Sequence, residues 1–381
     1  MGDGGEFHLF IPGPAGATPE VIEANGRPIV PHYGSAFVAT YNRCIELMQA
    51  VFQTNNDLFL IVGPGTASLD AALASALPDG ARVLVPSSGW FGYRLAEMCR
   101  AHRARVDVLE FAVGDAIDPA VVARRLEAAG DGYDAVAWIH HETSTGVLNP
   151  VEPIAAAARE HGALSIIDAV ASLGGVDLPV DAWGVDLCVS VANKCLAAPP
   201  GIAAISVSPR AWEAIDANPS TRSWYLDLRT WRRYREAWGD WHPFPTTVAS
   251  NVIEAMITSL EQILEEGLEA RFRRTAAAAA AVRGGLRAMG FEMFADDRVA
   301  SPVTTAVKAH PRLPVAELQA FLLERRSIYI SGGLADLAGK IFRVGHMGTS
   351  IDRAEVELLL DAVAEALREA GITVPAGLAQ K

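Results

Sequence analysis

The chain is poor in cysteine, and its few cysteines form no pattern. Four are present, Cys44, Cys99, Cys188 and Cys195, and none stands in a CxxC pair or at a Cys/His spacing typical of metal ligands. This distribution argues against a disulfide framework and against a cysteine-based metal site. We expect reduced thiols, which are typical of a reducing compartment.

Long apolar runs and a surplus of positive charge are also missing. No apolar stretch approaches the roughly 18 residues that span a bilayer, and the N-terminus lacks the basic and apolar regions of a secretory signal. The sequence therefore predicts a cytoplasmic protein with no membrane partner. The formal net charge of -13 disfavours nucleic acid as a partner, because phosphate binding needs Lys and Arg in excess on at least one face.

One short stretch departs from this acidic composition. Arginines are dense between Arg229 and Arg235, with Trp231, Tyr234 and Trp238 among them or just after them. We interpret this stretch as a packed, aromatic connection between domains or subunits.

The chain does contain enough apolar residues for a large core. It has 381 residues, 50% of them hydrophobic, which suits one large domain with a smaller one. Predicted strands are 58–62, 82–86, 106–111, 135–140, 164–168, 187–191 and 203–207. Predicted helices between them include 66–77, 121–129 and 154–161. This alternation predicts the α/β class, a mostly parallel sheet with helices on both faces.

After Asn251 the pattern changes to long helical stretches at 252–266 and 268–289. The segments beyond them, 303–309, 315–326, 328–330, 340–344 and 353–370, indicate a smaller α+β unit. We predict an N-terminal arm at residues 1–20, a large domain at residues 21–255 and a small domain at residues 256–381.

Two ionisable residues stand at or just beyond the ends of predicted strands. Asp168 closes the run 164–168, and Lys194 follows the run 187–191 ahead of a Pro-Pro-Gly turn. Taken singly, such an Asp is more often a helix cap and such a Lys a solvated loop residue. Together, an acid and an amine at the carboxyl edge of a sheet are what pyridoxal phosphate requires. The lysine forms the Schiff base, and the carboxylate keeps the pyridine nitrogen protonated.

Six stretches match one family in order and spacing. They are Ile11-Pro12-Gly13-Pro14, 52–57, the His-Glu-Thr-Ser-Thr-Gly turn at 141–146, 168–175, 194–201 and Phe342-Arg343-Val344-Gly345. On these stretches the chain resembles, over nearly its whole length, the class V aminotransferases of the alanine-glyoxylate, serine-glyoxylate and serine-pyruvate group. The resemblance implies the fold type I architecture, pyridoxal 5'-phosphate as cofactor and a homodimer with shared active sites.

The resemblance also implies roles for the two ionisable residues. Lys194 corresponds to the lysine that binds the cofactor, and its freed amine moves the proton between the substrate α-carbon and C4' of the cofactor. Asp168 corresponds to the partner of the pyridine nitrogen, whose positive charge lets the ring take up electrons.

A glycine-rich turn is the candidate phosphate site. The turn at 63–66 follows a predicted strand and opens a helix, which offers backbone N–H groups and the positive helix end to an anion. We assign the phosphate to Gly65, Thr66 and Ala67.

Three further residues are expected around the cofactor by resemblance. Phe91 stands where the family stacks an aromatic ring, and the adjacent Trp90 is the alternative. Thr143 is expected to donate a hydrogen bond to the ring hydroxyl or to Asp168. Asn193 stands where the family has a polar residue that contacts the phosphate.

Two residues are expected to act across the dimer. Thr247 would contact the phosphate bound to the other subunit, with Thr246 as the alternative. Tyr33 would border the opposite active site.

Arg343 is the candidate for binding the substrate carboxylate, because its planar guanidinium can donate two parallel hydrogen bonds to that group. We expect a transaminase that moves the amino group of alanine or serine to glyoxylate or pyruvate by a ping-pong mechanism. The alternative is a pyridoxamine-pyruvate aminotransferase acting on free pyridoxamine and pyridoxal, to which 193–196, 300–302 and 343–348 are similar. Against it, Leu334 stands where that enzyme carries a second arginine, and that enzyme should not need a phosphate site.

Overall fold

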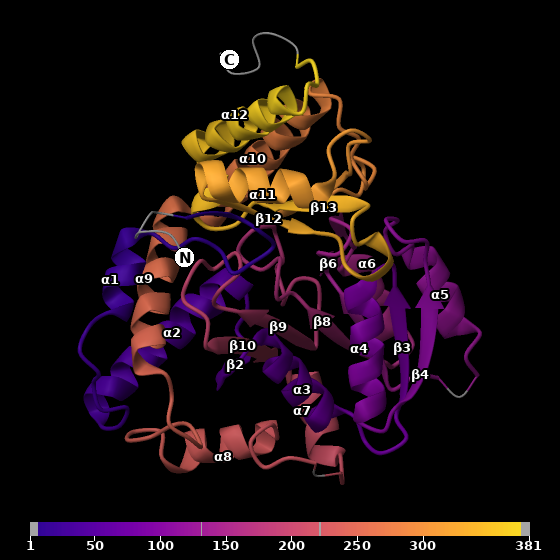
Figure 1. The fold of residues 1–381 in the computed structure, drawn as a ribbon. Coiled ribbons are helices and arrows are strands. Elements are labelled where there is room, and N and C mark those ends of the chain that lie inside the picture. Colours follow the sequence, from indigo (N-terminus) through magenta and orange to yellow (C-terminus); the bar gives the residue numbers. More distant parts are fainter. Residues whose placement is uncertain (1–6, 131, 221, 375–381) are drawn as a thin grey trace.

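A seven-stranded sheet forms the centre of the larger part of the molecule (Figure 1). The computed structural model describes residues 7–130, 132–220 and 222–374. In spatial order the strands are β2 (Asp57–Val62), β10 (Ile202–Val207), β9 (Leu187–Val191), β8 (Leu164–Asp168), β5 (Ala135–Ile139), β3 (Arg82–Ser87) and β4 (Arg105–Glu110). Within this sheet β10 runs antiparallel to β2 and β9, and the other neighbouring pairs are parallel. The predicted mostly parallel sheet is confirmed.

Helices pack along this sheet. α3 (Gly65–Ala76) contacts β9 and β10, α4 (Trp90–Ala101) contacts β3 and β4, and α6 (Glu152–Glu160) contacts β8. Every residue of β5, β8, β9 and β10 is buried, so both faces of the central strands are covered. The other elements of this part are α1 (Pro19–Asn25), α2 (Ser35–Phe52), α5 (Pro119–Glu127), β6 (His141–Glu142), β7 (Val147–Leu148), α7 (Pro209–Ala217), α8 (Leu228–Ala237) and α9 (Ser250–Glu266). Among the described residues, no helix combines the length and apolar character needed to cross a bilayer.

A second, four-stranded sheet lies in the upper part of Figure 1, below α11 (Val315–Arg326) and α12 (Arg353–Glu369). Its strands, in order, are β1 (His8–Phe10), β12 (Ile328–Gly332), β13 (Ile341–Gly345) and β11 (Thr304–Lys308). The helices packed with it are α10 (Leu268–Ala288), α11 and α12. A separate apolar core fills this part of the chain.

The N-terminal segment joins this second sheet. β1 pairs in parallel with β12, so His8 lies opposite Ile328, a pairing that the sequence analysis did not predict. The predicted boundary between residues 255 and 256 falls within α9, which packs on α1 and α2. The predicted arm at residues 1–20 and the two domain ranges stay predictions, and residues 1–6 and 375–381 lie outside the described residues.

Two helices that the sequence analysis did not name lack a local capping signal. α2 and α4 begin without a side-chain cap on the N-cap residue. At α4 the backbone N–H groups of Phe91 and Gly92 instead donate to the carboxylate of Glu142, at 3.3 and 3.1 Å. Since Glu142 is distant in sequence, tertiary structure creates this cap.

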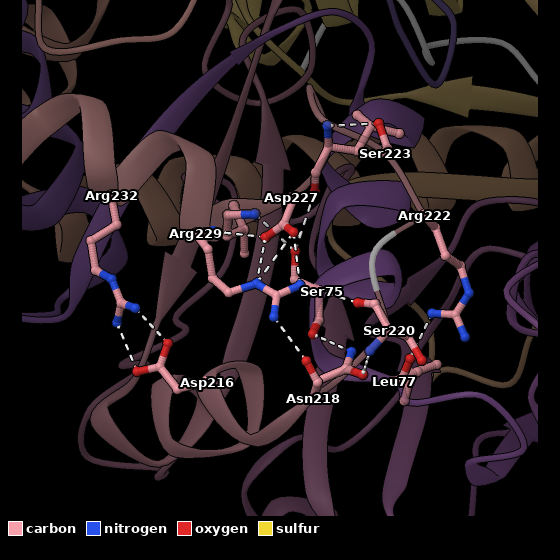
Figure 2. Close-up of polar contacts among 12 residues, drawn as sticks. Ser75, Leu77, Asp216, Asn218, Ser220, Arg222, Ser223, Asp227, Arg229 and Arg232 are labelled. Atoms are coloured by element: carbon pink, nitrogen blue, oxygen red, sulfur yellow. Dashed lines mark hydrogen bonds and ion pairs between the residues drawn. The ribbon is translucent and has the colours of Figure 1, made fainter.

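The arginine-rich stretch is bound to carboxylates of the same chain. Arg229 pairs with Asp227 at 2.8 Å, and Arg232 pairs with Asp216 at 3.1 Å. Figure 2 shows both pairs. Trp231 of the same helix is fully buried. These described contacts lie within the larger part of the molecule. Its charged partners come from the residue before α8, from α7 and from β2, where Asp57 pairs with Arg235 at 2.9 Å. The interpretation of the stretch as a connection between domains or subunits stays a prediction.

Candidate active site

A cavity of about 190 Å³ lies at the carboxyl edge of the large sheet, beside the ends of β8 and β9. Ligands bind at this edge in open α/β sheets. Seven residues that the sequence analysis assigned to the cofactor line this cavity: Gly65, Thr66, Phe91, Thr143, Asp168, Asn193 and Lys194. The fold therefore brings most of the predicted site together.

Asp168 presents a buried carboxylate to this cavity. Its side chain is 5% exposed, and Oδ1 accepts a hydrogen bond from the backbone N–H of Val170 at 2.9 Å. Burial raises the pKa of Asp168, while the Val170 N–H and the nearby positive charges of Arg94 and Lys194 act in the opposite direction. A cationic ring nitrogen in the cavity would likewise stabilise the ionised carboxylate.

Lys194 lies against the N-terminal segment. Its Nζ donates a hydrogen bond to the carbonyl oxygen of Pro12. Gly13 has a φ of +92°, and a Cβ there would overlap the end of the Lys194 side chain. Burial lowers the pKa of Lys194. The amine is therefore shifted toward the neutral form that acts as a nucleophile or a base.

The candidate phosphate site is the N-terminus of α3. Gly65 and Thr66 form its first turn and line the cavity. A Cβ on Gly65 would lie 2.6 Å from Cγ2 of Val170, so this position fits only glycine without rearrangement. Ala67 does not line the cavity, and its N–H donates to the carbonyl of Pro64 at 2.8 Å.

Phe91 and Trp90 have different environments. Phe91 lines the cavity, whereas Trp90 is 41% exposed and outside its wall. The sequence analysis missed Arg94, which lines the cavity with its Cζ 4.6 Å from the centroid of the Phe91 ring. The i, i+3 spacing of Phe91 and Arg94 was an available signal, because such residues share a helix face.

Arg343 projects from β13 toward the cavity wall. Its Nε donates to the carbonyl of Gly332 at 2.8 Å, and its Nη1 donates to the carbonyl of Thr143 at 3.0 Å. Burial lowers the pKa of Arg343 to about 10, so the guanidinium stays charged at neutral pH. Among the described residues it forms no ion pair with a carboxylate within 4.0 Å. The charge is thus available to an anionic ligand.

His141 is a second residue of the wall that the sequence analysis left without a role. Its Nδ1 lies 3.1 Å from the carbonyl of Val147, which identifies Nδ1 as the protonated nitrogen of the neutral ring. Burial lowers the pKa of His141 to about 4, so the imidazole is neutral at physiological pH. Its position two residues before Thr143 on the same turn was the available signal.

Thr247 and Tyr33 lie outside the cavity wall of this subunit. Thr247 is exposed in the segment before α9, and Tyr33 is 51% exposed with its ring centroid 5.9 Å from that of Trp241. The alternative Thr246 is partly buried and also outside the wall. The predicted role of these residues in a partner's site stays a prediction.

Comparison with known proteins agrees with this geometry. Residues 19–335 match the family described as Aminotransferase class-V. The chain belongs to the class-V aminotransferases. It is 32% identical to the solved ureidoglycine-glyoxylate aminotransferase of Bacillus subtilis, with a TM-score of 0.92 over 99% of this chain and 97% of that one.

Two other solved structures are similar to this class-V aminotransferase. The alanine-glyoxylate aminotransferase of Nostoc sp. is 31% identical, with a TM-score of 0.91 over 97% of this chain and 98% of that one. The pyridoxamine-pyruvate aminotransferase of Mesorhizobium loti is 32% identical, with a TM-score of 0.92 over 100% of this chain and 96% of that one. The fold is therefore that of the pyridoxal-phosphate enzymes of type I.

The cavity of this class-V aminotransferase fits pyridoxal phosphate, on which the family depends. One wall holds an amine, a buried carboxylate, an aromatic ring and a helix N-terminus, the groups that suit the aldehyde, pyridine nitrogen, ring face and phosphate of the cofactor.

Proposed function

We propose that this aminotransferase moves the amino group of alanine or serine to glyoxylate or pyruvate in two half-reactions. The observation that carries the proposal is that Lys194 and Asp168 share one small cavity, with the charged Arg343 hydrogen-bonded to Thr143 of its wall. Similar enzymes are named for glyoxylate or pyruvate as acceptor, which supports a small 2-oxo acid here.

Each residue then has a defined role. Bound pyridoxal phosphate supplies an electron sink for the α-carbon of the substrate. The Nζ of Lys194 anchors the cofactor and then moves the proton at the α-carbon. Asp168 holds the proton on the ring nitrogen, and Arg343 orients the substrate through its carboxylate. Gly65, Thr66 and Asn193 are proposed to hold the phosphate, with a smaller role for Ala67 because its N–H is already bonded.

The remaining parts of the proposal concern assembly, the contacts to the cofactor ring, and location. We propose a homodimer in which Thr247 and Tyr33 complete the partner's site, since both are exposed or half-exposed here. Thr143 is proposed to bind the ring hydroxyl, and Phe91 to stack on the ring. The four cysteines are buried and unpaired, in keeping with the proposed cytoplasmic location.

A half-reaction experiment tests the function. Purified holoenzyme is mixed with L-alanine or L-serine without an acceptor, and the absorbance of the cofactor is followed. We expect alanine or serine to bleach the cofactor band and glyoxylate or pyruvate to restore it. No bleaching with either amino acid would refute the proposed donors.

The same preparation tests the pyridoxamine-pyruvate alternative. An enzyme that uses free pyridoxamine as substrate would carry little organic phosphate after purification and would convert added pyridoxamine with pyruvate. We expect one phosphate for each bound cofactor and no turnover of free pyridoxamine.

A further inference from the structure

Arg271 links the two loops that carry Asp168 and Lys194. It lies near the start of α10 and is 7% exposed. Its Nε donates to the carbonyl of Gly174 at 3.0 Å, and its Nη2 donates to the carbonyl of Cys195 at 2.8 Å. Gly174 belongs to the segment that follows Asp168, and Cys195 is the residue after Lys194. We propose that Arg271 is a positioning residue that fixes the lysine relative to the carboxylate.

The two loops are packed directly on each other at this point. The thiol of Cys195 donates to the carbonyl of Ala171 at 3.4 Å. A Cβ on Gly175 would lie 2.6 Å from the Sγ of Cys195. The bonds from Arg271 join the two loops at this contact, so their loss would allow one loop to shift against the other.

A guanidinium is suited to this task. Both carbonyls lie in loops outside the sheet ladder, so each needs a donor from elsewhere. The planar fork supplies several N–H donors in fixed directions, whereas a lysine supplies a single flexible ammonium. The third edge of Arg271, at Nη1, lies 3.3 Å from Oε2 of Glu266, which balances the buried charge.

The same helix offers a matched control. Arg274 is bound to Glu266 at 2.7 Å and to Asp352 at 2.6 Å, and its hydrogen bonds reach neither loop. Replacing it removes an arginine and a bond to the same glutamate while leaving Gly174 and Cys195 in place. Arg271 and Arg274 also line the same cavity of about 210 Å³, so the two substitutions alter neighbouring parts of one surface.

The test compares Arg271→Met, Arg271→Lys and Arg274→Met as holoenzymes. Three quantities are measured: the single-turnover rate of the amino-transfer half-reaction, the pH at which the bound cofactor changes colour, and the midpoint of thermal unfolding. We expect Arg271→Met to slow the half-reaction by about 10²-fold, as a displacement of about 1 Å does. The pH of the colour change should move in the same variant, and Arg271→Lys should recover part of both losses.

Arg274→Met is expected to keep the wild-type colour-change pH and a half-reaction rate within about twofold, although it removes a comparable ion pair. Wild-type rate and colour-change pH in both Arg271 variants would overturn the proposal, and so would equal losses in Arg274→Met. If Arg271→Met does not fold, Arg271→Lys decides by the same two readouts.

This inference rests on the proposed roles of Lys194 and Asp168, and the two can fail separately. A wild-type protein without any half-reaction refutes the proposed function. An active wild type with unaffected Arg271 variants refutes only the positioning role.

Discussion

Arg343 in the small sheet donates a hydrogen bond from its Nη1 to the backbone carbonyl of Thr143, at 3.0 Å, across 200 positions of the sequence. Thr143 lines the cofactor cavity, so the bond joins the candidate substrate-binding group to the cofactor site. Glu142, the residue before Thr143, caps the N-terminus of α4, and its negative charge favours the charged form of Arg343. The turn that contains Glu142 and Thr143 therefore connects Arg343, the N-terminus of α4 and the cavity.

Arg343→Met is expected to raise the KM for both the amino acid and the 2-oxo acid, because both bind through a carboxylate. A charge-assisted hydrogen bond is worth about 1.5–3 kcal/mol, which corresponds to roughly 10–150-fold. Steady-state kinetics with each substrate varied in turn measures this. A change in KM for one substrate alone would contradict a shared carboxylate site.

Lys194→Ala is expected to reduce the half-reaction rate by about 10²–10⁴-fold, the usual contribution of a positioned acid or base. The exposed Lys308, which pairs with Glu292 at 2.9 Å, provides the control substitution Lys308→Ala. Borohydride treatment and peptide mapping should find the cofactor attached at Lys194. Attachment elsewhere would remove this residue from its proposed role.

Asp168→Asn keeps the shape of the side chain and removes its negative charge. The expected result is a loss of about 10²-fold or more in the half-reaction, since charge stabilisation of this kind is a large part of catalysis. Asp177→Asn, at an exposed position, is the control. Retained activity in Asp168→Asn, measured by single turnover, would show that the buried charge is not needed.

Gly65→Ala is expected to weaken binding of pyridoxal phosphate, because the new Cβ would lie 2.6 Å from Cγ2 of Val170. Overpacking of this kind costs about 1–3 kcal/mol. Titration of the apoprotein with cofactor measures the affinity, and adding Val170→Ala should restore part of it. The control is Gly284→Ala, a helical site with no atom within 4 Å, where alanine should stabilise by about 0.5–1 kcal/mol.

Three buried histidines predict acid sensitivity of the apoprotein. Burial lowers the pKa of His140 and His346 to about 3 and that of His141 to about 4. Unfolded histidine titrates near about 6.5, so below that pH the unfolded chain binds protons that the folded chain excludes. The three histidines therefore leave the free energy of unfolding unchanged above pH about 6.5. As the pH falls from there toward about 3, each lowers it by up to about 1.4 kcal/mol per pH unit.

Urea unfolding between pH 7.5 and 5 measures this slope. His346→Gln should flatten it, and the amide can keep the hydrogen bond that the ring makes with Thr305 at 2.9 Å. An unchanged slope in His346→Gln would mean that other groups cause the acid sensitivity.

The sequence alone determined the strands of the central sheet, several of its helices, and the placement of Asp168 and Lys194 at the carboxyl edge. Buried strands such as Leu164–Asp168 are continuous apolar runs, and parallel strands bring the residues at their carboxyl ends to one edge of the sheet. Asp168 and Lys194 were therefore placed together from local patterns. The resemblance added Arg343, Phe91 and Thr143, whose roles composition and periodicity do not reveal.

Tertiary structure alone decided the contacts that arrange these groups. Glu142 caps α4, Arg343 binds the carbonyl of Thr143, and Arg271 binds that of Cys195. Each bond joins a side chain to a backbone group far away in the sequence. Every residue has the same backbone C=O, and every residue except proline has the same N–H. No local sequence pattern therefore specifies which backbone group a distant side chain will bind. The pairing of β1 with β12 likewise joins groups that are distant in the sequence, here backbone to backbone.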